Sequence, residues 1–221
     1  MRKYIIIVAG GKGERMETTT PKQFLLLAGK PILMHTLDAF FRYDLQINII
    51  LVLPQAHHDT WARLCKQYNY TTPHQIVAGG KTRFHSVKNA LVLVPENVPV
   101  GVHDGVRPLV SQEVIQRCYK EAANHPAVVP VIPIAESIRI LNDEGINQPV
   151  DRDRLRIVQT PQVFQSTLLL KSYAAEYSPM FTDDASVVEN NTPIYLVAGN
   201  KENIKITTPE DLIVAEAFFH V

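Results

Sequence analysis

The sequence has little that would cross-link a protein or anchor it in a membrane. It contains only two cysteines, Cys65 and Cys118, with no Cys-x-x-Cys spacing, so neither a disulfide framework nor a zinc cluster is supported. Unbroken hydrophobic runs such as residues 49–53 are far shorter than the roughly 20 residues that a membrane helix needs. The run at 4–9 is also too short for the core of a signal peptide. These absences favour a cytoplasmic protein.

An excess of charge of one sign is lacking as well. Lysine plus arginine number 22 and aspartate plus glutamate number 22, which gives a formal net charge of zero. Proteins dedicated to nucleic acids or anionic membranes usually carry a basic excess. We therefore expect neither a nucleic acid nor a membrane surface as a partner, although the net charge does not say whether the charges gather locally.

An alternation of strand-like and helix-like segments runs through the 221 residues. Strands that are hydrophobic throughout suggest a parallel sheet covered on both faces. We expect them at 4–9, 47–53, 75–78, 98–103, 127–133, 194–197 and 203–207. Helices are expected after Pro31, around Trp61, from Phe84, after Ser111 and after Thr208. The pattern predicts an α/β fold with a doubly wound, Rossmann-like and mostly parallel sheet.

Residues 136–158 interrupt this alternation. Within them, 137–141 resembles a strand, 142–145 a turn and 155–159 a return strand. This charged hairpin has too few hydrophobic residues to pack well on the main sheet. It is either a floppy excursion or an arm that folds against a partner, and we favour the arm. The sequence thus predicts a single domain over 1–221 with a dimerisation arm at about 136–158.

The first expected strand runs into a glycine-rich segment at residues 9–13. Glycines at the carboxyl end of a strand let backbone N–H groups approach an anion closely, and open α/β sheets bind ligands at that edge. Lys12, Arg15 and Lys22 add three cations within eleven residues. The dinucleotide fingerprint does not fit, because Met16 stands at its third glycine position. The segment is either a phosphate-binding loop or a plain glycine turn with solvated charges.

Charged residues also accompany later strands. Asp104 follows an expected strand, where a carboxylate suits Mg²⁺ but could also cap the next turn; we expect its neighbour His103 to be structural. Lys205 is out of place in a buried strand unless an anion meets it. Asp183 and Asp184 could form a second metal or polyol site, or begin a helix. Taken together, these residues suggest a site that handles phosphates.

Seven motifs occur in order over nearly the whole chain. They are Ala9-Gly10-Gly11-Lys12-Gly13-Glu14-Arg15-Met16, Pro21-Lys22-Gln23-Phe24, Gly79-Gly80-x-x-Arg83-x-x-Ser86-Val87, His103-Asp104-x-x-Arg107-Pro108, Gln159-Thr160-Pro161-Gln162-x-Phe164, Thr182-Asp183-Asp184-Ala185-Ser186 and Asn203-Ile204-Lys205-Ile206-Thr207. In this combination the sequence resembles the 2-C-methyl-D-erythritol 4-phosphate cytidylyltransferases. The resemblance implies the conversion of CTP and methylerythritol 4-phosphate to 4-diphosphocytidyl-2-C-methyl-D-erythritol and pyrophosphate, in non-mevalonate isoprenoid biosynthesis.

The same resemblance implies roles for individual residues. The catalytic set is Arg15 and Lys22, which stabilise the charged transition state, with Arg152 and Lys205, which position the polyol phosphate. The nucleotide-binding set is Ala9, Gly10, Gly11, Gly13, Gly80, Ser86 and Asp104, and the substrate-binding set is Arg107, Ser137, Thr160 and Thr182. Mg²⁺ is the implied cofactor, with Asp104 as its ligand. The family's arm swaps across a homodimer, which would put Arg152 and Ser137 in the partner's site.

The residues agree with this chemistry. A phosphate monoester has a second pKa of about 6 and is mostly dianionic at pH 7. The polyol phosphate can therefore attack phosphorus without a general base. The reaction demands charge neutralisation and in-line positioning. Two alternatives stay open: a ribitol 5-phosphate cytidylyltransferase, and a nucleotide-binding protein without catalysis. The second is disfavoured because Arg15, Lys22, Asp104, Arg152 and Lys205 are all present.

Overall fold

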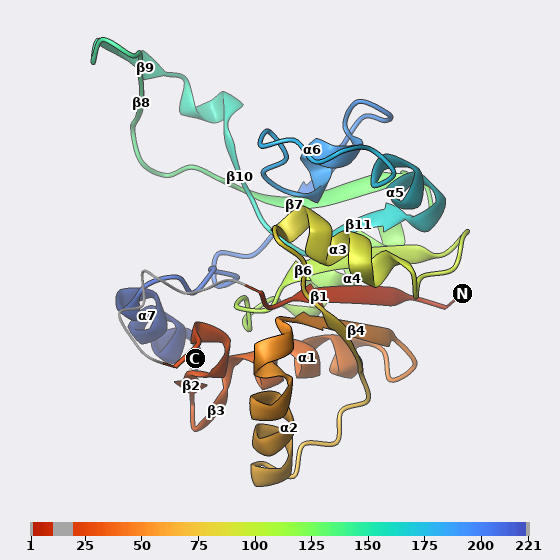
Figure 1. The fold of residues 1–221 in the computed structure, drawn as a ribbon. Coiled ribbons are helices and arrows are strands. Elements are labelled where there is room, and N and C mark those ends of the chain that lie inside the picture. Colours follow the sequence, from red (N-terminus) through yellow and green to blue (C-terminus); the bar gives the residue numbers. More distant parts are fainter. Residues whose placement is uncertain (1, 11–19, 220–221) are drawn as a thin grey trace.

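The structure, a computed structural model that describes residues 2–10 and 20–219, is a central β-sheet with helices on both faces (Figure 1). The strands of this sheet are β1 (Tyr4–Val8), β4 (Asn48–Leu53), β5 (Gln75–Ala78), β6 (Pro99–Asp104), β7 (Ala127–Pro133), β10 (Arg156–Val158), β11 (Gln162–Gln165) and β12 (Tyr195–Ala198). The α-helices are α1 (Ile32–Tyr43), α2 (His58–Gln67), α3 (Arg83–Leu91), α4 (Gln112–Glu121), α5 (Ser166–Ser172), α6 (Asp184–Val188) and α7 (Pro209–Phe219).

The order of the strands creates a switch point beside β1. Along the sheet the strands run β10, β7, β11, β6, β1, β4, β5, and β12 pairs with β7. From β1 the chain builds outward through β4 and β5, then returns to place β6 on the other side of β1; all these pairs are parallel. Open α/β sheets bind ligands at the carboxyl edge where the order reverses. The fold therefore directs attention to the ends of β1 and β6.

Alternate side chains of β1 enter two separate cores. Ile5 and Ile7 are fully buried with the hydrophobic residues of α1 and α4 and with Trp61 of α2. Ile6, which points to the opposite face, is buried with Phe84 of α3 and with residues of α5 and α6. Burial on both faces explains why the parallel strands are hydrophobic throughout, and it confirms the doubly wound, mostly parallel α/β fold.

The helix signals in the sequence are confirmed. The Ser111 hydroxyl accepts a hydrogen bond from the backbone N–H of Val114 at 3.3 Å and caps α4. The Thr208 hydroxyl does the same for the backbone N–H of Asp211 at 3.3 Å, directly before α7. A hydroxyl at this position satisfies one of the N–H groups that the first turn of a helix leaves unpaired.

The expected strand at residues 203–207 is wrong. This segment runs beside the body without pairing in a sheet, although the backbone N–H of Ile206 donates to the carbonyl of Val106 at 3.0 Å. Ile206 is buried and joins a third, smaller core with Leu27 and Ile32. The packing of Ile206, and of the partly buried Ile204, rather than a ladder of hydrogen bonds, accounts for the hydrophobic pattern that suggested a strand.

The pairing expected within the arm is also wrong. The first strand of the hairpin is β8 (Ile138–Leu141), and its partner is β9 (Asn147–Val150), not residues 155–159. The later segment forms β10, which pairs antiparallel with β7 in the main sheet. Between β9 and β10 lies the short helix η4 (Arg152–Arg154). The arm therefore leaves the body after β7 and returns to it at β10, and its tip is the β8–β9 hairpin (Figure 1).

Four further short elements complete the described chain. The 3-10 helix η2 (Lys22–Phe24) precedes the small hairpin of β2 (Leu26–Leu27) and β3 (Lys30–Pro31), and η3 (Gln55–His57) leads into α2. Within residues 2–10 and 20–219, no helix has the length and hydrophobicity needed to span a bilayer.

Candidate active site

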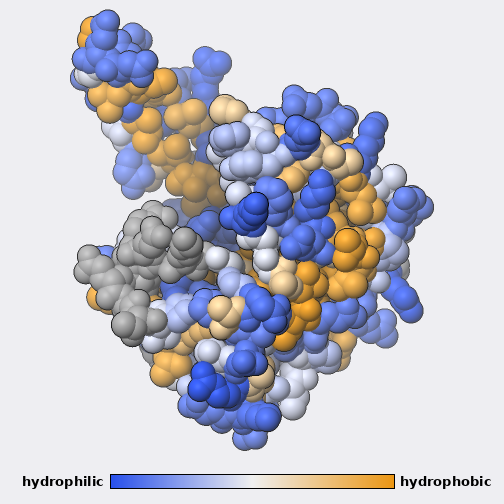
Figure 2. Space-filling model, in the orientation of Figure 1, coloured by the Kyte–Doolittle hydropathy of each residue, from blue (hydrophilic) through white to orange (hydrophobic). Residues whose placement is uncertain are grey.

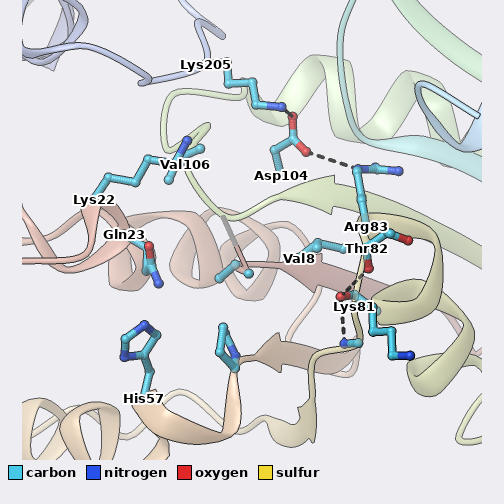
Figure 3. Close-up of a pocket in the computed structure, with 15 residues that line it drawn as sticks. Val8, Lys22, Gln23, His57, Lys81, Thr82, Arg83, Asp104, Val106 and Lys205 are labelled. Carbon is cyan, nitrogen blue, oxygen red and sulfur yellow. Dashed lines mark hydrogen bonds and ion pairs between the residues drawn. The ribbon is translucent and has the colours of Figure 1, made fainter. Parts of the chain in front are cut away.

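A cleft of about 580 Å³ lies at the carboxyl edge of the sheet, across the ends of β1, β4, β5 and β6 (Figure 3). The end of β1 contributes Ala9 and Gly10, and the end of β6 contributes Asp104. These two ends are adjacent because Val8 pairs with Asp104 in the sheet. The other residues that line the cleft are Val8, Lys22, Gln23, Pro54, His57, Gly80, Lys81, Thr82, Arg83, Ser86, Val106 and Lys205.

The loop between β5 and α3 forms one wall of the cleft and is held by its own hydrogen bonds. The backbone N–H of Gly80 donates to the Ser86 hydroxyl at 3.0 Å, and that hydroxyl donates to the carbonyl of Thr82 at 2.9 Å. A side chain at position 80 would collide with His85, since a Cβ there would lie 2.4 Å from the Cβ of His85 and 2.8 Å from its carbonyl carbon. Only glycine lets this loop close over the start of α3.

Asp104 is the centre of a cluster of three cations. Lys205 Nζ lies 3.0 Å and Arg107 Nε 3.3 Å from Oδ2 of Asp104, while Arg83 Nε lies 3.7 Å from Oδ1. Burial by itself would raise the pKa of this carboxyl, but the three cations outweigh it and hold the pKa well below its usual range. Asp104 is therefore ionised, and it is the anion that the sequence led us to expect beside Lys205.

Buried polar groups fix Asp104 from behind. The backbone N–H of Asp104 donates to the Thr160 hydroxyl at 3.2 Å, and that hydroxyl lies 2.9 Å from Nδ1 of His103. Nε2 of His103 lies 3.0 Å from the carbonyl of Arg107, so it carries the proton and donates. Burial lowers the pKa of His103 to about 4. The imidazole is thus a neutral structural link, as expected from the sequence, and does not act as a base.

Arg83 connects the cleft to a second buried acid. One of its nitrogens, Nη2, lies 2.5 Å from Oδ2 of Asp184, whose other oxygen accepts a hydrogen bond from the Tyr173 hydroxyl at 2.6 Å. Asp183 caps α6 by accepting from the backbone N–H of Ser186 at 2.9 Å. Of the roles left open for this acidic pair, the structure supports the beginning of a helix, together with a buried partner for Arg83.

The wall opposite the β5–α3 loop is built on η2. Lys22 and Gln23 line the cleft from this element, and His57 lines it from η3 (Figure 3). Phe24, the last residue of η2, stacks on Trp61 with ring centroids 6.2 Å apart and meets His57 edge-on at 5.8 Å. This aromatic packing anchors the short helix against α2.

The structure brings together about half of the residues singled out in the sequence. Those that line the cleft are Ala9, Gly10, Lys22, Gly80, Ser86, Asp104 and Lys205. Arg107 and Thr160 lie behind it, in contact with Asp104. Ser137, Arg152 and Thr182 are exposed and do not line it. Gly11, Lys12, Gly13 and Arg15 lie outside the described residues.

Arg83, Gln23 and His57 line the cleft but had no assigned role. Arg83 and Gln23 stand inside two of the quoted motifs, so their position beside glycines and a cation was a usable signal. Nothing in the sequence around His57 signals a place in a ligand site. Its place follows from β4 ending next to β1, a relation that only the sheet order provides.

The lining of the cleft shows how a divalent cation could be held. In the described part of the chain Asp104 is the only carboxylate among the lining residues, and no group of three or more potential ligands forms a metal site. Both Asp104 oxygens already face cations. The described lining thus fits an ion bound mainly by substrate phosphates, beside the one carboxylate of Asp104, which is a common arrangement for Mg²⁺.

The fold and the cleft define the class of protein. Four cations, on Lys22, Lys81, Arg83 and Lys205, face a single acid among the described lining residues at the switch point of an open α/β sheet. Such a site suits a phosphorylated ligand such as a nucleotide. The chain is, on these grounds, a Rossmann-like nucleotide-binding protein.

Comparison with known proteins gives the family. Residues 4–220 match the family model of 2-C-methyl-D-erythritol 4-phosphate cytidylyltransferase. The enzyme of that name from Bacteroides thetaiotaomicron is 54% identical over 98% of this chain and 99% of its own length. A bifunctional enzyme from Desulfotalea psychrophila is 40% identical over 97% of this chain, which corresponds to 56% of that protein. The chain therefore belongs to the 2-C-methyl-D-erythritol 4-phosphate cytidylyltransferase family, whose members are nucleotidyltransferases.

Solved structures agree with this assignment. The 2-C-methyl-D-erythritol 4-phosphate cytidylyltransferase of Thermus thermophilus superimposes with a TM-score of 0.81 at 31% identity, and each chain is covered completely. The 4-diphosphocytidyl-2C-methyl-D-erythritol synthase of Anaerococcus prevotii gives a TM-score of 0.83 at 29% identity, covering 100% of this chain and 99% of the other. The likeness thus extends over the whole fold.

Proposed function

We propose that this chain transfers a cytidylyl group from CTP to 2-C-methyl-D-erythritol 4-phosphate, forming 4-diphosphocytidyl-2-C-methyl-D-erythritol and pyrophosphate in non-mevalonate isoprenoid biosynthesis. The observation that carries the proposal is the cation-lined cleft at the switch point, in a chain that belongs to this family over nearly its full length. We place the reaction in the cytoplasm, where the free thiols of Cys65 and Cys118 would stay reduced.

The chemistry requires the protein to bring two anions together rather than to move a proton. An oxygen of the polyol phosphate attacks the α-phosphorus of CTP, the new P–O bond forms, and the bond to the β-phosphate breaks with pyrophosphate as the leaving group. The attacking phosphate is mostly dianionic at pH 7, so no residue needs to deprotonate it. Fixed cations that meet the developing charge are the main catalytic device.

In this scheme Lys22 and Arg15 stabilise the charge that develops at the α-phosphate. Lys22 lies on η2, which Phe24 anchors against α2, and it lines the cleft. Ala9 and Gly10 at the end of β1, with Gly80 and Ser86 on the wall opposite η2, hold the cytidine. The proposal also assigns Gly11 and Gly13 to the nucleotide's phosphates, with Lys12 at the pyrophosphate.

Lys205 and Arg107 serve the polyol phosphate. Both are held by Asp104, and Lys205 remains partly exposed at the cleft. The buried acid fixes their positions and offsets part of their mutual repulsion in the empty site. An anionic phosphate that arrives in the cleft meets Lys205, while Arg107 adds positive charge from behind Asp104. Thr160 supports the same strand end through the backbone of Asp104.

Mg²⁺ would neutralise phosphate charge and polarise the α-phosphoryl group. Asp104 is the carboxylate we assign to it, since the other described lining residues offer no acid. The triphosphate would supply most of the remaining ligands.

The arm is proposed to complete the site of a second copy in a homodimer. Ser137 and Arg152 lie on it and do not line the cleft of their own chain. Figure 2 shows the arm standing clear of the body with hydrophobic side chains on its surface. The exposed hydrophobic residues of the arm and its base are Ile140, Leu141, Ile146, Ile157 and Val158. Such exposed hydrophobic side chains favour an interface with another protein surface.

Thr182 lies outside the arm, exposed beside α6. We propose that it contacts the polyol.

The test is pyrophosphate release from CTP and Mg²⁺, with methylerythritol 4-phosphate and ribitol 5-phosphate offered separately. The proposal expects rapid release with the first polyol and little with the second. Release with ribitol 5-phosphate alone would assign the chain to the other polyol. CTP binding without release in either reaction would leave only the nucleotide-binding role.

A further inference from the structure

The side chain of Gln23 is buried in an unusual way. The residue is 1% exposed, yet its Nε2 atom has no hydrogen-bond partner among residues 2–10 and 20–219. Two other buried polar atoms in this part of the chain share that condition, but both are acceptors, Oε1 of Gln159 and Oδ1 of Asn203. Buried donors in folded proteins are nearly always paired, and an unpaired one destabilises the fold.

The unpaired amide belongs to the wall of the cleft. Gln23 stands between Lys22 and Phe24 on η2 and lines the cleft together with Lys22 and His57. Figure 3 shows its amide on the wall between these two residues. A hydrophobic residue of similar size could fill this position without leaving a donor unpaired, so a glutamine here needs an explanation outside the packing of the free protein.

The surroundings hold the amide at this position. Phe24 stacks on Trp61, and the backbone N–H of Phe24 donates to the carbonyl of Pro21 at 2.8 Å. Trp61 is fixed in turn, because its indole N–H donates to Nε2 of His74 at 2.9 Å. This packing holds η2, and Gln23 with it, against the body at the wall of the cleft.

We propose that Gln23 is a nucleotide-binding residue whose Nε2–H donates a hydrogen bond to an oxygen of bound CTP. The inference rests on the proposed function for the identity of the nucleotide. The partner must be a hydrogen-bond acceptor, which CTP offers in its phosphate oxygens and in the carbonyl of its base. Gln23 then pairs when the nucleotide binds, and Lys22 on the same element supplies the adjacent charge.

The test compares wild type with Gln23→Met, which keeps the length of the side chain and removes the donor. CTP binding is measured by titration calorimetry without any polyol, and thermal unfolding is measured without ligand. We expect Kd for CTP to rise about tenfold, as for the loss of one hydrogen bond to a charged or polar acceptor. The melting temperature of the free protein should stay unchanged or rise, because Nε2 of Gln23 has no hydrogen bond to lose among the described residues.

Gln165→Met is the matched control. Nε2 of Gln165 donates to the carbonyl of Ala122 at 2.5 Å, and the residue pairs with Pro99 at the edge of β6 away from the cleft. Its replacement should lower the melting temperature and leave CTP affinity unchanged. This is the opposite pattern from Gln23→Met, so a general effect of removing an amide is separated from a role in binding.

Pyrophosphate serves as a second probe. Weaker binding of both CTP and pyrophosphate in Gln23→Met would place the acceptor on the phosphates, and weaker binding of CTP alone would place it nearer the base; either result supports the proposal. Unchanged CTP affinity of Gln23→Met would overturn the proposal, whatever the melting temperature. Because no polyol is present, the result stands apart from the assay of cytidylyl transfer.

Discussion

The charged residues of the cleft and those of the arm have opposite environments. In the cleft, Asp104 at the end of β6 gathers Arg83, Arg107 and Lys205 around one buried carboxylate, and all four residues belong to the same chain. On the arm, Arg152 is exposed, and its guanidinium donates only to the nearby carbonyl of Ala135 among the described residues. One region is organised within a single chain, whereas the other presents charge and hydrophobic surface outward.

This difference assigns distinct tasks to the two regions. Fixed cations in a partly buried cleft suit transition-state stabilisation, because they need no reorganisation when charge develops. An exposed cation on a projecting hairpin becomes equally well fixed only when another surface covers it. The comparison therefore predicts large chemical effects from changes in the cleft, and effects on assembly from changes in the hydrophobic residues of the arm.

The largest effect is expected for Lys22→Ala. Loss of a cation that meets developing charge should lower kcat by about 10²- to 10³-fold, with a much smaller change in the affinity for CTP. Steady-state kinetics together with calorimetry of CTP binding separates the two quantities. Lys66→Ala, which removes an exposed lysine of α2, is the control and should behave like wild type. Near-normal turnover of Lys22→Ala would remove this lysine from the catalytic set.

The next effect concerns the free energy of unfolding and its dependence on pH. Asp104→Asn removes the charge that three cations share, and we expect a loss of about 3 kcal/mol of unfolding free energy at pH 7. Because the folded-state pKa of Asp104 is lowered, its stabilisation is fully present above the unfolded pKa of about 3.9 and is lost as pH falls through the folded value. The difference between wild type and variant should therefore shrink below about pH 4.

Urea unfolding of both proteins across this pH range measures the effect. Asp143→Asn changes an exposed acid at the turn of the arm, and it should match wild type at every pH. If the gap between wild type and Asp104→Asn stays constant from pH 7 to pH 3, the charge cluster does not contribute through the ionisation of this carboxyl.

A smaller effect is expected at the tip of the arm. Leu141 of β8 is 68% exposed, so Leu141→Ser should change the stability of the monomer by less than about 0.5 kcal/mol. If the arm forms the dimer, the same change should weaken association in sedimentation velocity. Leu45→Ser, at an equally exposed position of the body (71%), should leave association unchanged. Equal association of both variants and wild type would exclude Leu141 from the interface.

The body of the fold was predictable from the sequence, whereas the arm was only partly so. Strands such as β1 and β4 are buried on both faces, so their composition alone identifies them. The pairing of β8 with β9 depends on contacts that a charged, exposed hairpin does not encode in hydrophobic periodicity. The short strand β11 also escaped notice, since Gln162 and Gln165 at its ends obscure its hydrophobic centre.

The site divides in a similar way. Lys22, Asp104 and Lys205 were identifiable because a charge beside a glycine turn, or within a hydrophobic segment, is conspicuous in a sequence. Gln23 stands in a quoted motif beside Lys22, but only the three-dimensional packing reveals that its donor has no partner among the described residues. His57 likewise reaches the cleft through the adjacency of β4 and β1, which periodicity cannot supply.

We propose that the cleft of one chain works with the arm of another, and subunit mixing tests this proposal most directly. Lys22→Ala and Arg152→Ala are each expected to be inactive, and they are mixed under conditions in which native mass spectrometry demonstrates exchange. In a symmetric dimer with random exchange, half the molecules are mixed and each has one intact composite site. Activity should then recover to about one quarter of wild type. No recovery in a sample that contains the mixed dimers would contradict the claim, since Arg152 would then act within its own chain.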